Sequence, residues 1–211
     1  MNGFEEYLEN IRKIAKEEGY DSLDETYVEH LRARFYKEDV IIGKTKRILL
    51  REIKPSDICA FYKFEDARTE DVLGAFLKDT PEESKAYLES YITHMYPMYD
   101  YGMWTAEYRE TGEIIGICGL GQAEVNGEMC TDLGYYICPK WRNQGLASEC
   151  VEFVLDYVKK YLEFECIYAI IKEENRISKG ILRKFGFKYK LSWEGTEGKK
   201  SLYQKDLKEQ Q

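Results

Sequence analysis

The 211 residues are enough for one well-buried domain with an appendage, and 44% hydrophobic with 33% charged residues is the composition of a globular chain rather than a disordered one. The net charge of −8 argues against an extended nucleic-acid-binding surface, because phosphate contacts need basic residues, and it suits a cationic partner better. The chain opens without a basic and apolar leader, and no apolar run approaches the ~20 residues that span a bilayer, so we expect a cytoplasmic protein with no membrane partner.

Cysteine and histidine usage predicts neither a metal centre nor a disulfide framework. The six cysteines stand singly in apolar stretches without Cys-x-x-Cys spacing, so we expect reduced core thiols. The two histidines, His30 and His94, leave little material for a histidine-dependent triad or a multi-histidine metal site.

Residues 1–45 are predicted to form a helical extension. Apolar residues recur at helical spacing from Phe4 to Ala15, Gly19 ends this helix, and the stretch from Ser22 to Asp24 can cap a second helix. The segment is too short to enclose its own core, so we expect a packed appendage in front of a main domain over residues 46–211.

The main domain is predicted to mix helices and strands in an α+β order. A strand at 47–53 precedes a helix start at 55–57, and a capping box from Thr80 to Glu83 begins a second helix. Turns at Thr111-Gly112 and Asn126-Gly127 join three strands into an antiparallel meander. The predicted elements from there on are strands 103–109, 113–121 and 129–137, helix 145–162, strand 166–171, helix 175–184, and strands 187–193 and 201–207.

The stretch from Cys138 to Cys150 joins a strand to a helix through proline, basic and amide residues. A helix N-terminus leaves backbone N–H groups unpaired and carries the positive end of the helix dipole, so it attracts anions. Gly145 and Ala147 would let a ligand approach this backbone, which suggests a diphosphate resting on amides. An ordinary strand-to-helix loop with a glycine turn would explain the same residues.

A second signal favours the diphosphate site. Asn175 and Ser178 begin the next helix, and Lys184, Gly186 and Phe187 follow its end. With Arg142, Gly145 and Ala147 matching the pyrophosphate signature, the sequence resembles the GNAT acyltransferase superfamily from about residue 46 to 207. The runs 47–51 and 145–150 are similar to its RimJ/RimL branch, whose members acetylate protein α-amino groups and, in relatives, small amines.

The resemblance implies a central, mostly antiparallel, twisted sheet of about seven strands flanked by helices, with acetyl-CoA as donor and no metal. It implies that backbone amides near the end of one strand meet the pantetheine and thioester, that the loop amides hold the pyrophosphate, and that the next helix contacts the pantetheine arm or sulfur. The implied cofactor residues are Tyr136, Ile137, Arg142, Asn143, Gln144, Gly145, Leu146, Ala147, Asn175 and Ser178.

Transfer to an amine needs a base, because an alkyl amine with a pKa of ~10.4 is mostly protonated at neutral pH. Asp132 is the leading candidate, since the family often places an acidic residue on this strand, and Glu194 and Glu197 near the last hairpin are rivals. Each could instead be a solvated carboxylate at a strand edge. The resemblance implies that the Ile137 N–H stabilises the oxyanion.

The residue that usually protonates the departing thiolate in the family is absent from this chain. Many relatives carry a tyrosine where this chain has Leu182. Ser178, one turn earlier, is the candidate donor to the sulfur, although it could merely cap or pack the helix.

These observations predict an N-acetyltransferase that works by direct attack in a ternary complex. A catalytically weak acyl-CoA-binding regulatory or interaction module is the alternative, and the N-terminal helices could serve as a docking or homodimerising element. The acceptor stays open between a protein N-terminus and a small polyamine or aminoglycoside-like amine. The aromatic run from Tyr96 to Trp104 could line its pocket or pack in the core. The glycines of 116–121 imitate a dinucleotide fingerprint but lead into a hairpin, so we reject that reading.

Overall fold

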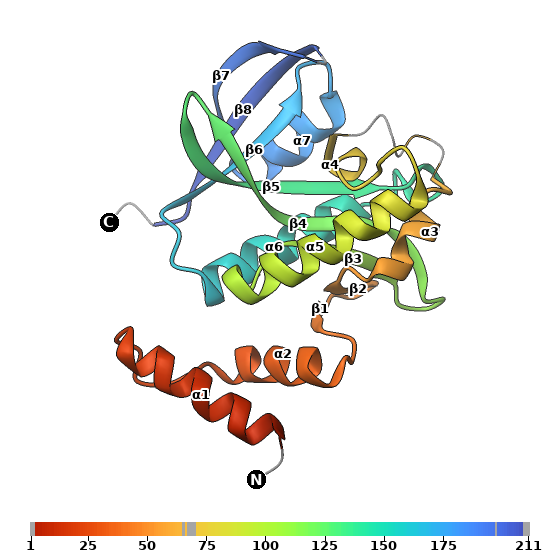
Figure 1. Cartoon of the computed structure of the whole chain (residues 1–211). Coiled ribbons are helices and arrows are strands. Elements are labelled where there is room, and N and C mark those ends of the chain that lie inside the picture. The colour runs from red at the N-terminus through yellow and green to blue at the C-terminus, as the bar shows by residue number, and fades with distance from the viewer. Residues whose placement is uncertain (1–2, 65, 67–70, 197, 209–211) are drawn as a thin grey trace.

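The computed structural model describes residues 3–64, 66, 71–196 and 198–208, which form an α+β fold around one eight-stranded sheet (Figure 1). The strand order is β1-β2-β3-β4-β5-β6-β8-β7, and every neighbouring pair is antiparallel except β5 with β6. The strands are β1 Ile41–Lys44, β2 Ile48–Glu52, β3 Met103–Tyr108, β4 Glu113–Val125, β5 Glu128–Ile137, β6 Cys166–Lys172, β7 Lys188–Gly195 and β8 Gly198–Asp206.

Two apolar layers cover the two faces of the sheet. The larger layer joins one face to helices α6 (Leu146–Tyr161) and α7 (Arg176–Lys184), and it includes Leu133 and Ile137 of β5. The other layer joins the opposite face to α3 (Ile58–Phe61), α4 (Asp71–Gly74) and α5 (Pro81–Tyr99), and it includes Tyr136. Alternate residues of β5 therefore face different helices, as the two-residue period of a strand requires.

The sheet opens between β5 and β6. These parallel strands pair at a single position, Asp132 with Tyr168, whereas β6 pairs with β8 along its whole length. Beyond that position β5 continues to Ile137 and is hydrogen-bonded on its other side to β4. The predicted separation of the strand around Tyr136 and Ile137 from its neighbour is thus present.

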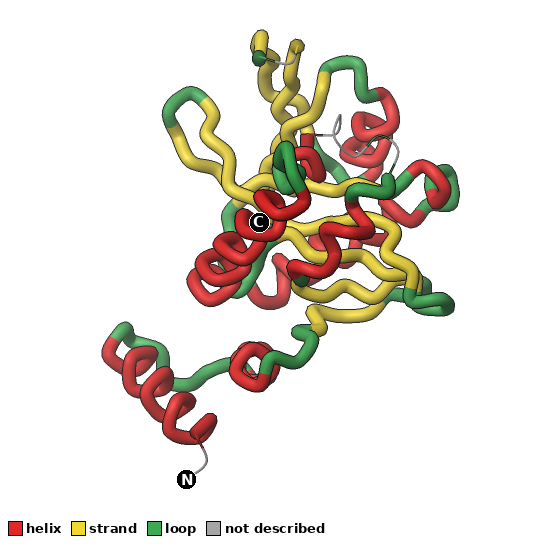
Figure 2. Tube along the Cα trace, turned by 45° about the vertical axis from the view of Figure 1, so that its right-hand side comes forward, coloured by secondary structure: helices red, strands yellow, loops and turns green. Residues whose placement is uncertain are grey.

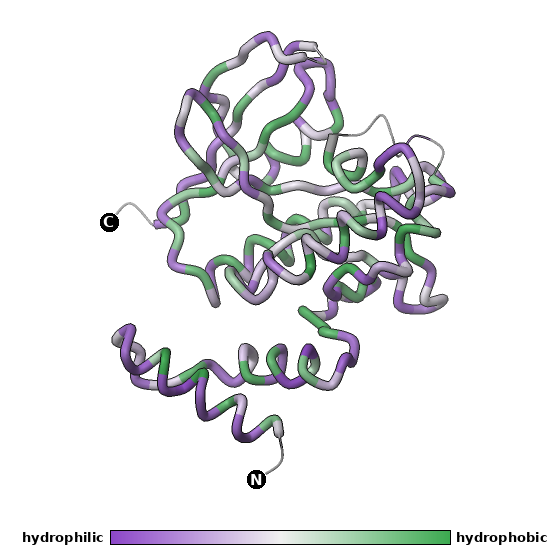
Figure 3. Tube along the Cα trace, viewed as in Figure 1, coloured by the Kyte–Doolittle hydropathy of each residue, from purple (hydrophilic) through white to green (hydrophobic). Residues whose placement is uncertain are grey.

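The N-terminal helices α1 (Gly3–Glu17) and α2 (Glu25–Tyr36) lie at one end of the molecule, apart from the sheet, in both views (Figures 1 and 2). Hydrophilic and hydrophobic segments alternate along α1 (Figure 3), and its apolar side packs on α2 around Phe4, Leu8 and Leu31. Ion pairs of Arg34 with Glu52 and Asp100 connect α2 to the main body.

Most predicted elements are present, with three differences. The eighth strand, β1, was not predicted and lies inside the span 1–45 assigned to the extension. The short helix α4 was also not predicted, whereas the predicted helix start at 55–57 is present and leads into α3. The β4–β5 hairpin is longer than expected and turns at Asn126-Gly127, both with positive φ, as an Asn-Gly hairpin turn requires. Within the described residues, no helix is long and apolar enough to cross a membrane.

Candidate active site

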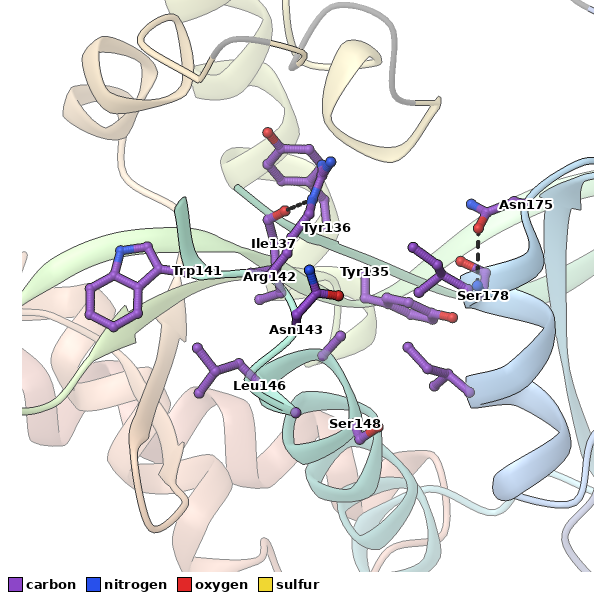
Figure 4. Close-up of a pocket in the computed structure, with 14 residues that line it drawn as sticks. Tyr135, Tyr136, Ile137, Trp141, Arg142, Asn143, Leu146, Ser148, Asn175 and Ser178 are labelled. Atoms are coloured by element: carbon purple, nitrogen blue, oxygen red, sulfur yellow. Dashed lines mark hydrogen bonds between the residues drawn. The ribbon is translucent and has the colours of Figure 1, made fainter. Parts of the chain in front are cut away.

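A cavity of about 340 Å³ lies at the end of β5, between the N-terminus of α6 and helix α7 (Figure 4). It opens where β5 and β6 separate. Every residue implied as a cofactor contact lines it except Gln144, which is exposed in the adjoining loop. The two segments that carry the sequence signatures, 142–147 and 175–178, therefore face one space.

The backbone N–H groups of the first turn of α6 are available to bind a ligand. Gly145 is the N-cap of α6, with φ +78°, and a glycine has no side chain that could accept a hydrogen bond from the first-turn amides. By contrast, α2, α5 and α7 are capped by the side chains of Asp24, Thr80 and Asn175. Unpaired amides at the positive end of a sixteen-residue helix form a suitable anion site.

Two arginines hold the loop that leads into α6. The Arg142 Nε donates to the Ile137 carbonyl at 2.8 Å, and its guanidinium pairs with Asp66 at 2.7 Å. Arg47 donates to the Gln144 carbonyl at 2.9 Å. Its Nη2 lies 3.7 Å from where a Cβ on Gly145 would stand. The arginines fix the loop backbone and place positive charge beside the helix N-terminus.

Arg47 was missed by the sequence reasoning. Its side chain pairs with Glu149 on α6, and the same carboxylate accepts a hydrogen bond from the Arg47 backbone. These contacts join the start of β2 to the first turn of α6. Since the two segments are far apart in the sequence, spacing alone offered no signal for this contact.

The backbone of Ile137 presents a donor to the opening. Cys138 N–H donates to the Ile115 carbonyl on β4 at 2.8 Å. Because successive N–H groups of a strand point to opposite sides, the Ile137 N–H points away from β4, toward the side from which β6 has separated. This orientation is the one that polarisation of a thioester carbonyl in the cavity requires.

On α7, the Asn175 side-chain oxygen accepts a hydrogen bond from the Ser178 N–H at 3.0 Å and so caps the helix. Its amide nitrogen is left for a ligand or solvent. Leu182 is fully buried in the main core, so the position where relatives carry a tyrosine does not face the cavity.

Tyr135 is a second residue that the sequence reasoning missed. Its ring lies in the cavity with the hydroxyl pointing toward α7 (Figure 4). The hydroxyl is buried without a hydrogen-bond partner among the described residues. Burial raises the pKa of Tyr135 to about 12, and the neighbouring Ser178 opposes this rise. The available signal was the two-residue period of β5, which puts Tyr135 on the same face as Ile137.

Asp132 lies in a second cavity, of about 440 Å³, bounded by α4, α5 and the sheet. Desolvation raises the pKa of this half-buried carboxyl to about 6. None of the ion pairs found among the described residues involves Asp132. A Cβ on its cross-strand neighbour, Gly121, would come within 2.9 Å of the carboxylate. The glycine therefore provides the space in which the carboxylate sits.

The two cavities approach the β5–β6 opening from opposite faces of the sheet. The first cavity meets α6 and α7, which cover one face, and the second meets α4 and α5, which cover the other. Asp132 stands at the last paired position before the strands part.

Of the two rival carboxylates, the structure describes only Glu194, which is not part of this arrangement. Glu194 is exposed on β7, opposite Lys199 of β8, and lines neither cavity, and Glu197 lies outside the described residues. In the aromatic run, Tyr96, Tyr101 and Trp104 are buried in the core.

The acetyltransferase (GNAT) domain model matches residues 47–188. The chain belongs to the GNAT acetyltransferase family. This family membership confirms the prediction of an acetyl-CoA-dependent acyltransferase, and the eight-stranded open sheet with flanking helices is its fold.

Known relatives of this GNAT acetyltransferase agree with the assignment. The uncharacterized N-acetyltransferase YoaA of Bacillus subtilis is 29% identical over an alignment that covers 69% of this chain and 82% of YoaA. The uncharacterized protein YkkB of the same organism is also 29% identical, over 43% of this chain and 53% of YkkB. The alignment thus spans only about half of YkkB. A structure of RimL, a ribosomal L7/L12 alpha-N-protein acetyltransferase in complex with coenzyme A, is 15% identical with a TM-score of 0.64, covering 79% of this chain and 97% of the other.

Proposed function

We propose that this GNAT acetyltransferase transfers an acetyl group from acetyl-CoA to a primary amine by direct attack within a ternary complex. The observation that carries the proposal is the uncapped N-terminus of α6, which opens into the same cavity as the Ile137 N–H. Across the β5–β6 opening from it lies Asp132, a carboxyl with a raised pKa. A donor and an acceptor would then meet without an acyl-enzyme step.

The donor side binds through backbone groups. The first-turn amides of α6 and the loop from Arg142 to Gly145 would hold the diphosphate of the coenzyme. The Ile137 N–H would donate to the thioester carbonyl and to the oxyanion that forms as the amine attacks. Asn175 and Ser178, at the start of α7, would contact the pantetheine arm.

The acceptor side depends on Asp132. A base works best when its pKa lies near the operating pH, and burial brings this carboxyl from its ordinary value to about 6. The carboxylate is therefore ionised at neutral pH and more basic than a solvated aspartate. It would attract the ammonium form of the acceptor and take up one proton as the amine becomes the nucleophile.

The departing thiolate is stabilised on the α7 side of the cavity. Tyr135 and Ser178 both present hydroxyl groups there. With a pKa of about 12, Tyr135 keeps its proton more firmly than a thiol, whose pKa is ~8.5 in a cysteine. Tyr135 would therefore act by donating a hydrogen bond to the sulfur, and the thiolate would take up the second proton that the nitrogen releases as the amide forms.

The test combines binding with turnover. Calorimetry should detect acetyl-CoA binding, and thiol release should appear when amines are added. We expect Asp132→Asn to lower kcat/KM by about 10²–10³-fold while the Kd for acetyl-CoA stays unchanged. Binding without turnover, unaffected by Asp132→Asn or Ser178→Ala, would instead support the acyl-CoA-binding module. Neither binding nor thiol release would refute both.

A RimL-type acceptor is one candidate for the amine. RimL is a ribosomal L7/L12 alpha-N-protein acetyltransferase, so a protein α-amino group is a possible acceptor for this chain as well. A small primary amine remains the other candidate class.

A further inference from the structure

The cavity around Asp132, where the amine would bind, is called the acceptor cavity below. Its described lining is mainly apolar and carries few charged side chains. Asp132 is the sole acidic side chain among the described residues that line it. The rest of the wall is largely aromatic or aliphatic, contributed by α4 and the residues that follow it, α5, β3 and β6: Val72, Phe76, Tyr87, Tyr91, Met95, Met103 and Ile170. Among the described lining residues, the cavity therefore offers one anion, one cation and mainly apolar surface.

Two glycines let the groups around that anion pack closely onto the sheet. A Cβ on Gly134 would stand 3.2 Å from both the Met103 sulfur and a methyl group of Val72. A Cβ on Gly121 would approach the Asp132 carboxylate itself. Asp132, Met103 and Val72 are thereby held side by side in the lining of the cavity.

Cations stand at the wall of the same cavity. Lys200 lines it, and the Lys78 ammonium lies 3.9 Å from the ring centre of Tyr87, another lining residue. A second ammonium on the acceptor would find no second carboxylate among the described lining residues. Because an unpaired charge on an apolar surface is strongly unfavourable, the wall selects against polycations despite the net charge of −8.

We infer that the acceptor is a monoamine carried on an apolar or aromatic body, rather than a polyamine or an aminoglycoside. The ammonium pairs with Asp132, and the body packs against Phe76, Met95 and Met103. The inference rests on the proposed acetyl transfer. The same chemistry is offered by a small amine and by a peptide α-amino group whose first side chain is apolar.

The experiment compares acceptors that differ in one charge. Thiol release from acetyl-CoA is measured with hexylamine against 1,6-diaminohexane, and with tetrapeptides Phe-Ala-Ala-Ala against Lys-Ala-Ala-Ala. We expect kcat/KM to be at least 10-fold higher for the apolar member of one or both pairs. Activity confined to the amine pair indicates a small-molecule source, and activity confined to the peptides indicates a chain terminus.

Substitutions in the wall test its role in this preference. Met95→Asp places a second carboxylate in the cavity and should lower the hexylamine preference at least 10-fold. Met98→Asp is the matched control, because Met98 is on the same helix, is 69% exposed and lines no part of the cavity. Gln122→Glu, an isosteric change at an exposed lining residue, repeats the test if Met95→Asp does not fold.

The outcomes separate this inference from the proposed function. Faster turnover of 1,6-diaminohexane, spermidine or kanamycin than of hexylamine and the Phe peptide would overturn the acceptor class and leave acetyl transfer standing. An equal effect of Met95→Asp and Met98→Asp would also overturn it. Failure to bind acetyl-CoA, with no thiol release for any amine, would overturn the proposed function itself.

Discussion

At the residue scale, Asp132 combines a functional position with a cost in stability. Its carboxyl is half-buried, faces a cavity and has its pKa raised to about 6 by desolvation. A structural carboxylate in such a place would normally be paired with a cation, because ionising an unpaired buried acid opposes folding. The absence of an ion pair for Asp132 among the described residues is therefore better explained by function than by packing.

We expect Asp132→Asn to stabilise the protein above neutral pH. The folded-state pKa is higher than that of the unfolded chain, so the ionisation penalty is absent below pH ~4, grows as the pH rises, and is complete above about 6. At about 1.4 kcal/mol per pKa unit, the variant should gain about 1–3 kcal/mol at pH 8 and nothing at pH 4. Urea unfolding at the two pH values measures this gain. The exposed carboxylate Glu124 provides the control, as Glu124→Gln.

The hydroxyl of Tyr135 contributes to the cavity and not to the fold. It has no hydrogen-bond partner among the described residues, so Tyr135→Phe should leave stability unchanged while lowering kcat about 10-fold. The loss should shrink with acetyl thioesters of more acidic thiols, because their thiolates depend less on a hydrogen bond.

Tyr157→Phe is the matched control for that prediction. Its hydroxyl donates to the Asp100 carbonyl at 2.9 Å, and Tyr157 is not among the residues that line the cavity. This variant should lose about 1 kcal/mol of stability and keep its kcat. A Tyr135→Phe enzyme with unchanged kcat for every thioester would contradict the role of Tyr135 and favour Ser178 as the hydroxyl that contacts the sulfur.

At the scale of elements, the N-cap of helix α6, Gly145, affects both the local backbone conformation and the proposed ligand site. Gly145 adopts a φ of +78°, which turns the chain from the loop into the helix and leaves the first-turn amides without a side-chain cap. A serine or aspartate that caps a helix normally has extended backbone, so at this φ neither residue could cap the amides without strain. The sequence keeps a glycine there, which leaves these amides for an anion.

Gly145→Ala should weaken acetyl-CoA binding about 10-fold. The left-handed conformation costs an alanine about 1–2 kcal/mol, and its methyl group would lie 3.7 Å from the Arg47 guanidinium, at the mouth of the cavity. Gly112→Ala is the control, because Gly112 has a similar φ of +69° with nothing within 4 Å of its Cβ position. Both variants should lose similar stability, and calorimetry should show weaker binding in Gly145→Ala alone. Equal affinity in the two would contradict an anion site at α6.

The donor side could be predicted because its residues are local in sequence. The loop into α6 and the start of α7 each carry a short signature whose backbone geometry follows from glycine and capping residues. Tyr135 was not predicted as a site residue, because its position in the cavity depends on the separation of β5 from β6. That separation is a property of the whole sheet. Arg47 was missed because its partners lie about a hundred residues away.

The acceptor cavity could not be predicted for the same reason. Its walls come from α4, α5 and strands in both halves of the sheet, so no continuous segment encodes it. Asp132 was found only through the family resemblance, and its rival Glu194 was set aside only when the fold placed it on an outer strand. The edge strand β1 is only four residues long, too short for periodicity to separate it from a linker.

At the scale of the whole molecule, the N-terminal segment is joined to the catalytic body in two ways. Residues 41–44 extend the sheet as β1, with Val40 and Ile42 buried against the core. Helix α2 docks through Arg34, which pairs with Glu52 at the end of β2 and with Asp100 after α5. We therefore propose that the helical appendage proper ends before Asp39 and that the sheet needs the residues that follow.

Arg34→Met should destabilise the protein by about 3–5 kcal/mol, because it leaves the carboxylates of Glu52 and Asp100 without their cation. Burial already raises the pKa of Glu52 in spite of Arg34, and removing the arginine raises it further. The loss should therefore be greater at pH 8 than at pH 5, where Glu52 can take up a proton.

Arg32→Met supplies the comparison on the same helix, since Arg32 is exposed and its guanidinium lies only near the ring of Tyr36. This change should alter stability by less than about 0.5 kcal/mol at either pH. Urea unfolding of both variants at pH 5 and 8 distinguishes a docked appendage from a loosely attached one. If both variants lose the same small amount of stability, the attraction within the Arg34 ion pairs only balances the cost of desolvating the charges. Helix α2 would then be held by apolar contacts instead.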